Sequence, residues 1–268
     1  EVHIIEFLDH ITPGMDKEIS KEFMKILKKQ GMQFHMQTKV ESIKKNKKGA
    51  SILTVNKEGK KVNFECDVVL ISVGRKSYIK NLNLEAVGVA LDQKKRIKTD
   101  KNFLTNVKNI YAIGDVIKGP MLAHKAEEEG IAVAENIAGQ SGHVNYDVIP
   151  GVIYTSPEVA AIGKTEEQLN ELNIKYKIGK FPFMANSRAK AIDQSEGFVK
   201  ILSDQTTDKV LGAHIIGNHA GEMIAEIAIA MEFGASSEDI ARTCHAHPTF
   251  SEALKEAALS VDKRAIHS

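Results

Sequence analysis

Apolar and polar positions in the first forty residues predict a strand, a helix and a second strand. Residues 2–7 form a β-rich apolar run with an acid, Glu6, near its end, and residues 34–40 alternate between apolar and polar side chains. Between them, Asp16 is placed to cap a helix that Gly31 ends. The helix carries four apolar residues at helical spacing: Ile19, Phe23, Ile26 and Leu27. This order is typical of a dinucleotide-binding unit, whose second strand ends in a carboxylate.

Two continuous apolar runs farther along the chain each end at a glycine. Residues 67–73 lead to Gly74, and residues 109–113 lead to Gly114 and Asp115. Buried parallel strands have this continuous character, and ligands of open α/β sheets bind beyond their carboxyl ends. We therefore predict two buried strands, with Gly74 and Asp115 at a ligand-binding edge. For Asp115, the alternative interpretation is an ordinary turn acid at a strand end.

A helix is predicted to begin after Gly119 and to run to about Ala138. Its predicted apolar side has four members: Ala126, Ile131, Ala134 and Ile137. The first turn of a helix has free N–H groups and a partial positive charge, so this end is suited to stabilising negative charge. His124 is equally well explained as a polar residue of the first turn.

The pattern changes at residues 145–150, which we predict as a domain boundary. Five short apolar runs beyond it predict strands, at residues 152–154, 159–162, 176–183, 198–202 and 210–216. Helices are predicted at residues 220–233 and after Thr249. This succession predicts an α+β domain.

Composition excludes few classes of protein but bounds the fold. The 268 residues are 43% hydrophobic, enough for one large core or two to three small ones. With 36 basic and 35 acidic residues, the charge balance gives no reason to expect a nucleic acid or a membrane surface as partner. The only cysteines, Cys66 and Cys244, have neither zinc nor redox spacing, so we predict buried thiols in a reducing compartment.

The most specific chemical motif lies near the carboxyl end, where residues 244–252 read Cys-His-Ala-His-Pro-Thr-Phe-Ser-Glu. A neutral imidazole accepts a proton near pH 7, and a carboxylate on its far nitrogen fixes the tautomer. His247 is the candidate base and Glu252 its orienting partner, and the proline between them disfavours a helical conformation for His247. Two alternatives stay open: Thr249 and Glu252 form a capping box, or His245 and His247 bind a metal.

This motif resembles the C-terminal active-site signature of the dihydrolipoamide dehydrogenase family of flavoprotein disulfide reductases, and the similarity continues over essentially the whole chain. The resemblance implies that His247 accepts a proton from a dithiol substrate and that Glu252 is its hydrogen-bond partner. It also implies that Asp115 bonds a ribitol hydroxyl of FAD. Four further FAD contacts are implied at the start of the predicted helix, largely through backbone groups: Met121, Leu122, Ala123 and His124.

The same resemblance implies three residues that bind NAD. Glu6 would accept a hydrogen bond from the adenosine ribose, Val40 would line the adenine pocket, and Gly74 would let the backbone approach the nucleotide. Residues 7–9 are Phe-Leu-Asp, with no arginine to neutralise a 2′-phosphate, so NAD is favoured over NADP. From the residues alone, a solvated acid at a strand end is the alternative for Glu6.

The implied fold is α/β with three parts. Residues 1–75 are expected to form the C-terminal part of a Rossmann-like NAD-binding domain, residues 76–146 a central FAD-contacting segment, and residues 147–268 an α+β interface domain. The family pairs such domains across a two-fold axis, so we expect a homodimer in which His247 reaches the flavin site of the other subunit.

The implied reaction is oxidation of protein-bound dihydrolipoamide, through an enzyme disulfide and FAD, with reduction of NAD⁺. The implied partners are the lipoyl domain and the subunit-binding domain of the acyltransferase component of 2-oxo acid dehydrogenase complexes. The implied compartment is the bacterial cytoplasm or the mitochondrial matrix. Alternatives are a related disulfide reductase, of the glutathione or mercuric type, and a non-catalytic dimerisation module.

Two parts of the family pattern do not occur in this sequence: the redox-active Cys-x4-Cys pair and the flavin-binding G-x-G-x-x-G motif. The chain also begins Glu-Val-His-Ile-Ile, without an initiator methionine, and enters a strand directly. The sequence therefore predicts a fragment or processed piece that shows no lipoamide turnover alone.

Overall fold

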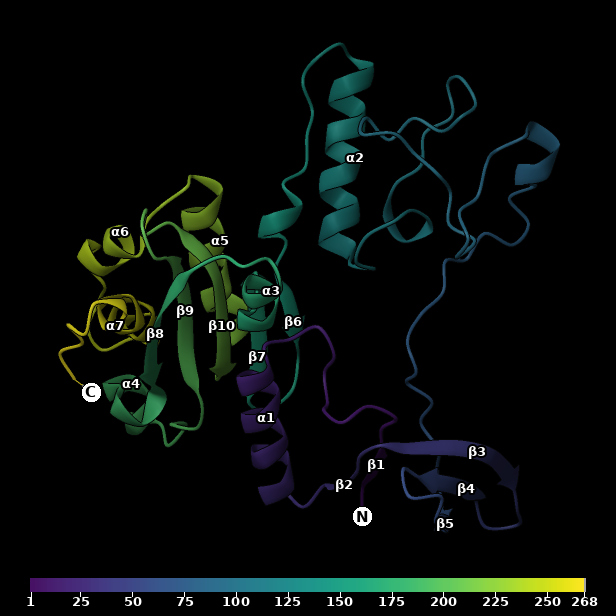
Figure 1. The fold of residues 1–268 in the computed structure, drawn as a ribbon, viewed down its shortest axis with the longest axis horizontal. Helices are drawn as coiled ribbons and strands as arrows, with labels where there is room; N and C mark the ends of the chain where they lie inside the picture. Colours follow the sequence, from purple (N-terminus) through teal and green to yellow (C-terminus); the bar gives the residue numbers. More distant parts are fainter. Residues whose placement is uncertain (268) are drawn as a thin grey trace. The chain divides into compact units, whose positions relative to one another are not determined.

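The computed structural model describes residues 1–267 and divides the chain into two compact units (Figure 1). One unit contains Glu1–Val69 and the chain from Asp147 onward, and the other contains Leu70–Tyr146. The structure is mixed α/β, as the sequence predicts. Among residues 1–267, no helix combines the length and the apolar character needed to cross a membrane.

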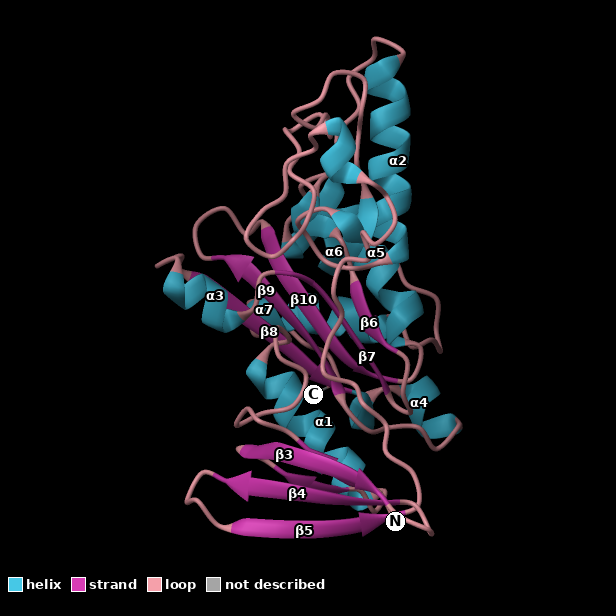
Figure 2. Cartoon of the chain, turned by 90° about the vertical axis from the view of Figure 1, so that its right-hand side faces the viewer, coloured by secondary structure: helices cyan, strands magenta, loops and turns pink. Residues whose placement is uncertain are grey.

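A five-stranded antiparallel sheet forms the centre of the larger unit, in the order β6-β7-β10-β9-β8 (Figure 2). Its strands are β6 (Gly151–Ile153), β7 (Glu158–Gly163), β8 (Tyr176–Pro182), β9 (Phe198–Asp204) and β10 (Val210–Gly217). Helices α5 (Ala220–Glu232) and α7 (Glu252–Val261) pack on one face, and α6 (Ser237–Arg242) packs on α7. The predicted α+β arrangement is confirmed, because each of the five expected strands is present.

Alternation along β9 separates the two faces of this sheet. Val199 and Ile201 belong to the core beneath α5 and α7, whereas Phe198 belongs to a second core beneath α1 (Lys17–Lys29). The side chains of α1 buried in that second core are Ile19, Phe23, Ile26 and Leu27. Asp16 caps α1 as predicted, since its carboxylate accepts the Glu18 N–H at 3.0 Å. Helix α1 therefore covers the second face of the sheet.

Two small sheets and several short elements complete the larger unit. Strands β1 (His3–Ile5) and β2 (Gln33–His35) form a parallel pair. Strands β3 (Thr38–Lys45), β4 (Ala50–Asn56) and β5 (Lys61–Cys66) form an antiparallel sheet. The short elements are α3 (Glu166–Glu171), η4 (Phe183–Ala185), α4 (Ser187–Ala191) and η3 (Tyr146–Val148), whose first residue belongs to the other unit.

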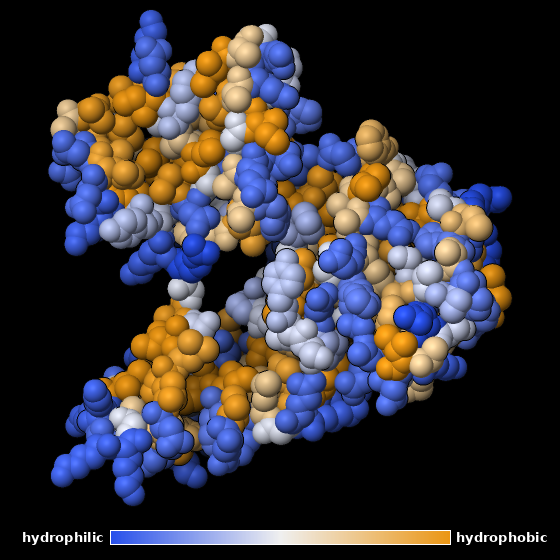
Figure 3. Space-filling model, turned by 180° about the vertical axis from the view of Figure 1, so that it is seen from behind, coloured by the Kyte–Doolittle hydropathy of each residue, from blue (hydrophilic) through white to orange (hydrophobic). Residues whose placement is uncertain are grey.

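The Leu70–Tyr146 unit contains little regular structure: η1 (Leu84–Val87), η2 (Gly114–Val116) and α2 (Ala123–Ile137). Its small core consists of Val89, Ile97, Phe103, Ala112, Ile117 and Ala132. The predicted apolar side of α2 is wrong, because Ile131 and Ile137 are exposed while Lys125 and Glu129 are buried. Figure 3 shows apolar side chains gathered on the surface of this unit and on the β3–β5 sheet.

The two continuous apolar runs do not form the buried strands that the sequence predicts. In residues 67–73, Val68, Leu70 and Val73 are 83%, 88% and 90% exposed, and the segment is in no strand. Residues 109–113 form no strand, and Tyr111 makes an isolated β-bridge with Leu104. An apolar run becomes a buried parallel strand only when neighbouring strands and covering helices flank it. Among residues 1–267, no strand pairs with the segment 67–73.

A buried lysine joins α1 and α3 to the sheet. Lys200 of β9 has no exposed side-chain surface, and its Nζ lies 3.0 Å from Asp16 Oδ1 and 3.1 Å from Glu18 Oε2. It also forms an ion pair with Glu166 of α3. Burial acts to lower the pKa of Lys200, but the carboxylates outweigh burial and raise that pKa to about 12.

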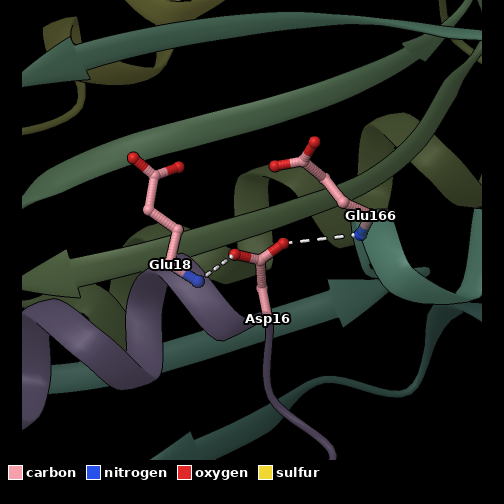
Figure 4. A group of neighbouring side chains, drawn as sticks. All are labelled: Asp16, Glu18 and Glu166. Atoms are coloured by element: carbon pink, nitrogen blue, oxygen red, sulfur yellow. Dashed lines mark hydrogen bonds between the residues drawn. The ribbon is translucent and has the colours of Figure 1, made fainter.

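The three carboxylates of this group converge closely enough to hold a metal ion (Figure 4). However, the Lys200 ammonium ion already lies among them and supplies a positive charge there, and Glu18 also pairs with Lys180. We call Asp16, Glu18, Glu166 and Lys200 the Lys200 cluster. We interpret this cluster as a structural network of ion pairs and not as a metal site.

Replacing Lys200→Met should strongly destabilise the chain, because it leaves the buried carboxylate of Asp16 without its ammonium partner. We expect the free energy of unfolding to fall by about 3–5 kcal/mol, measured by urea denaturation. Lys29→Met is the control: Lys29 is exposed and pairs with exposed Glu196, so its change should stay within about 1 kcal/mol. Equal losses in the two variants would contradict a structural role for the Lys200 cluster.

Candidate active site

The loop between α6 and α7 holds His247 beside Glu252, the first residue of α7. His247 Nδ1 lies 2.8 Å from Glu252 Oε1, and the peptide bond between His247 and Pro248 is cis. The His247 side chain is 64% exposed, and its Nε2 makes no hydrogen bond to residues 1–267. Because a carboxylate only accepts, Nδ1 must donate, and the neutral ring then presents a free lone pair on Nε2. This arrangement suits a general base.

Two groups hold the Glu252 carboxylate. Its Oε1 faces His247, and its Oε2 accepts the Thr249 N–H at 2.8 Å. Partial burial acts to raise the pKa of Glu252, but the Thr249 amide and the His247 ring outweigh burial, so this pKa is lowered. Glu252 therefore stays ionised near neutral pH and can stabilise a protonated His247.

The capping-box alternative for Thr249 and Glu252 is wrong. Ser251 is the N-cap of α7, and no side chain caps this helix end. The Thr249 hydroxyl donates instead to the Ala246 carbonyl at 2.7 Å. Only one half of a capping box is present, so capping does not account for the position of Glu252.

His245 makes a second pair with a carboxylate from another helix. Its Nε2 lies 2.6 Å from Glu226 Oε1 of α5, its Nδ1 lies 3.0 Å from the Thr243 carbonyl oxygen, and the side chain is 5% exposed. Both partners only accept, so the doubly protonated ring alone satisfies both bonds. The hydrogen bond to Glu226 raises the pKa of His245. Sequence reasoning missed Glu226, which lies 19 residues before His245.

The metal alternative for His245 and His247 gains no support. Each ring is paired with a different glutamate. Among residues 1–267, the one group of ligand-type side chains close enough to hold a metal is that of the Lys200 cluster.

Asp115 lies in η2, where a basic side chain reaches it. Its Oδ2 accepts from Arg75 Nη2 at 2.8 Å, and its backbone carbonyl accepts from the Ser77 hydroxyl at 2.6 Å. Gly114 before it has φ +73° and approaches α2 so closely that an added Cβ would lie 3.1 Å from that of Ala126. Sequence reasoning missed Arg75 and Ser77, because no local pattern links them to a residue some forty positions away.

The segment from Met121 to His124 forms the entrance of α2. Leu122 is the N-cap residue with an extended backbone, and it provides no side-chain cap. Ala123 and His124 begin the helix at the surface. The first-turn N–H groups therefore donate no hydrogen bond to the N-cap side chain, which leaves the helix end suited to a ligand with acceptor groups.

Of the three residues expected to bind NAD, Glu6 and Val40 lie in the larger unit and Gly74 lies in the other unit. Glu6 Oε1 accepts the Leu8 N–H at 2.8 Å, and its carbonyl accepts the N–H of Thr38, which begins β3. Val40 is partly exposed two residues farther along β3. The structure thus brings Glu6 and Val40 to neighbouring segments. Gly74, with φ +95°, belongs to the Leu70–Tyr146 unit.

The two cysteines are unpaired and differ in exposure. Cys66 is half-buried, with its thiol toward the Ala50 carbonyl at 3.4 Å, and Cys244 is exposed. The prediction of two buried thiols is therefore wrong for Cys244, which lies in the loop that also holds His247 at the surface.

Two family models match successive parts of the chain. Residues 1–130 match pyridine nucleotide-disulphide oxidoreductase, and residues 149–258 match the dimerisation domain of pyridine nucleotide-disulphide oxidoreductases. The chain belongs to the pyridine nucleotide-disulphide oxidoreductase family.

Relatives within this family are similar over the whole chain. Mitochondrial dihydrolipoyl dehydrogenase of Pisum sativum is 55% identical over 100% of this chain and 54% of its own length. That of Dictyostelium discoideum is 53% identical over 100% of this chain and 55% of its own length. Leghemoglobin reductase of Glycine max is 55% identical over 97% of this chain and 50% of its own length. The chain spans about half the length of the curated relatives it matches.

Solved structures share the fold. LpdA from Mycobacterium tuberculosis has a TM-score of 0.87 at 24% identity, covering 96% of this chain and 55% of that one. The Cu(II) complex of RclA, an HOCl-induced flavoprotein disulfide reductase from Escherichia coli, has a TM-score of 0.87 at 25% identity, covering 96% of this chain and 58% of that one.

The pairing of His245 with Glu226 predicts a pH-dependent stability. Because the pKa of His245 is raised on folding, its contribution is fully present below the unfolded value of about 6.5 and is lost as pH rises through the folded pKa. At about pH 5.5, we expect the free energy of unfolding to be about 1–2 kcal/mol lower in His245→Gln than in the wild type. Denaturation at about pH 9 should show a clearly smaller difference.

The control for this experiment is His143→Gln, which removes an exposed histidine of the other unit. It should not reproduce the pH-dependent loss. A difference of the same size at both pH values would show that His245 is not held in its charged form.

Proposed function

We propose that this chain is the C-terminal part of an NAD-dependent dihydrolipoyl dehydrogenase, which oxidises protein-bound dihydrolipoamide to lipoamide. The observation that carries the proposal is the His247–Glu252 pair, with a free imidazole nitrogen directed away from the carboxylate. The 55% identity to a mitochondrial dihydrolipoyl dehydrogenase over the whole chain supports it.

The proposed role of His247 is to make the substrate dithiol reactive. A thiolate, and not a thiol, attacks a disulfide. His247 Nε2 would take the proton from one dihydrolipoyl sulfur, and the ring would become an imidazolium ion. Glu252, ionised and bonded to Nδ1, would stabilise this charge and keep the ring in place. Cys66 and Cys244 lack the spacing of a redox pair, so the disulfide would come from residues outside this sequence.

Residues of the Leu70–Tyr146 unit fit a flavin nucleotide. Arg75 bonds one oxygen of the Asp115 carboxylate, which is partly exposed and can accept from a ribitol hydroxyl through its other oxygen. Backbone groups of Met121, Leu122, Ala123 and His124 would meet the flavin at the entrance of α2. FAD bound there would supply the electron-accepting chemistry between the disulfide and NAD⁺.

The NAD site is proposed from Glu6, Val40 and Gly74. A carboxylate at Glu6 would accept from the adenosine ribose, and the partly exposed Val40 would contact adenine. The positive φ of Gly74 would allow the backbone to approach the nucleotide. The three side chains after Glu6 offer no positive charge to a 2′-phosphate, which favours NAD over NADP.

The proposed assembly is a homodimer, supported by the match of residues 149–258 to a dimerisation domain. In it, His247 would act beside the flavin of the other subunit. The proposed partners are the lipoyl and subunit-binding domains of an acyltransferase. The mitochondrial names of several relatives favour the mitochondrial matrix over a bacterial cytoplasm.

In the complete polypeptide, His247→Gln should lower kcat/KM for dihydrolipoamide by about 10²–10⁴-fold, because substrate then has no base. Steady-state NADH formation measures this loss. The same variant should still transfer electrons from NADH to an artificial acceptor, since that reaction needs no thiol deprotonation. Undiminished oxidation of dihydrolipoamide would refute the assigned role.

The 268-residue chain by itself should not form NADH from dihydrolipoamide and NAD⁺, even with added FAD, because it lacks a redox-active cysteine pair. Adding the complete enzyme to the same assay mixture provides the positive control. Turnover that copurifies with the isolated chain would overturn this expectation.

A further inference from the structure

Helix α2 buries two opposite charges on its inner side. Lys125 and Glu129 stand one turn apart, both side chains are 0% exposed, and Lys125 Nζ lies 3.0 Å from Glu129 Oε1. Tyr146 donates its hydroxyl to the same Oε1 at 2.6 Å. Burial, followed by the hydrogen bond to Glu129, raises the pKa of Tyr146, which therefore stays a donor. We call these three residues the Lys125–Glu129 clamp.

The clamp holds both backbone polar groups of Gly114. Glu129 Oε2 accepts the Gly114 N–H at 2.7 Å, and Lys125 Nζ donates to the Gly114 carbonyl at 3.0 Å. Both ends of one turn residue are thus fixed by side chains of a helix that begins nine residues later. These two side chains, together with the Ile117 N–H that also donates to the Gly114 carbonyl, satisfy this buried backbone in place of a strand neighbour.

The turn also wraps closely around Lys125. A Cβ added at Gly119 would lie 3.0 Å from Lys125 Cε. Gly114 approaches α2 near Ala126, with a positive φ that other residues rarely adopt. Residues 114–119 are therefore folded against the lysine at both ends, and Asp115 lies within this segment.

An ion pair in this position is better explained by geometry than by stability. A buried ion pair often contributes no more stability than well-packed apolar side chains of the same volume. Apolar side chains, however, could not bond the Gly114 N–H and carbonyl. What the charges add is a fixed conformation of the turn that carries Asp115.

From these contacts we infer that Lys125, Glu129 and Tyr146 are positioning residues, which set the place of the Asp115 carboxylate and of the α2 entrance relative to a bound flavin nucleotide. This inference rests on the proposed FAD site. It assigns to α2 two roles, since the start of the helix would meet the flavin, while Lys125 and Glu129 hold Gly114, the residue before Asp115.

The test is the double variant Lys125→Met/Glu129→Leu, which removes both charges at similar volume. In the complete polypeptide, we expect a midpoint of thermal unfolding close to that of the wild type but a Kd for FAD raised at least about tenfold. The visible absorption bands of the bound flavin should also shift, because Asp115 no longer lies in one place. Glu128→Gln, an exposed acid of the same helix, is the matched control and should change neither quantity.

A second measurement uses the 268-residue chain without any cofactor. Hydrogen exchange of the Gly114 amide should be at least about tenfold faster in the double variant than in the wild type, because its acceptor is gone. Glu129→Gln keeps an acceptor oxygen and should restore much of the protection. Tyr146→Phe, which leaves the Gly114 bonds intact, should have a smaller effect.

The outcomes separate this inference from the proposed function. An unchanged Kd and unchanged Gly114 exchange in the double variant would overturn the inference. A raised Kd for FAD that is accompanied by a large drop in the midpoint of thermal unfolding would also overturn it. Tight FAD binding by the wild type without oxidation of dihydrolipoamide would instead refute the proposed function and leave the clamp supported.

Discussion

A charged side chain can be buried at low cost only where groups of opposite charge and hydrogen-bond partners surround it. Both units of this chain contain such a buried charge. Lys200 of β9 pairs with Asp16, the N-cap of α1, and with Glu166 of α3. The same principle holds Gly114 through Lys125 and Glu129. In each unit a buried lysine joins segments that are separate in the sequence. The orientation of α1 and of the Asp115 turn therefore depends on electrostatic pairing as well as on hydrophobic burial.

The two histidines of the α6–α7 loop differ because their partners differ. His245 faces two acceptors and is largely buried, so the charged ring is favoured. His247 faces one carboxylate and solvent, which leaves one nitrogen available for proton transfer. A ring that stays charged can anchor the loop to α5, whereas a ring that changes charge can act on a substrate. Two histidines only two positions apart thus have different hydrogen-bond partners and different exposure.

The sequence predicted those features that local periodicity and short spacings determine. The strands from Gly151 onward, the Asp16 cap and the pairing of His247 with Glu252 follow from local periodicity and spacing. Residues 67–73 were misassigned because an apolar run does not state whether neighbouring strands exist. Lys125 and Glu129 escaped notice since a helical pair at i and i+4 normally lies in solvent. Glu226 and Arg75 act across distances in sequence that no local pattern encodes.

The uncovered run that includes Val68, Leu70 and Val73 has a consequence for the handling of this polypeptide. Extended apolar backbone with unsatisfied amides is a template for intermolecular β-pairing. The formal net charge of +1 offers little repulsion between copies. The exposed apolar side chains of this run therefore offer the isolated chain a surface through which copies can associate, and masking them should lower that tendency.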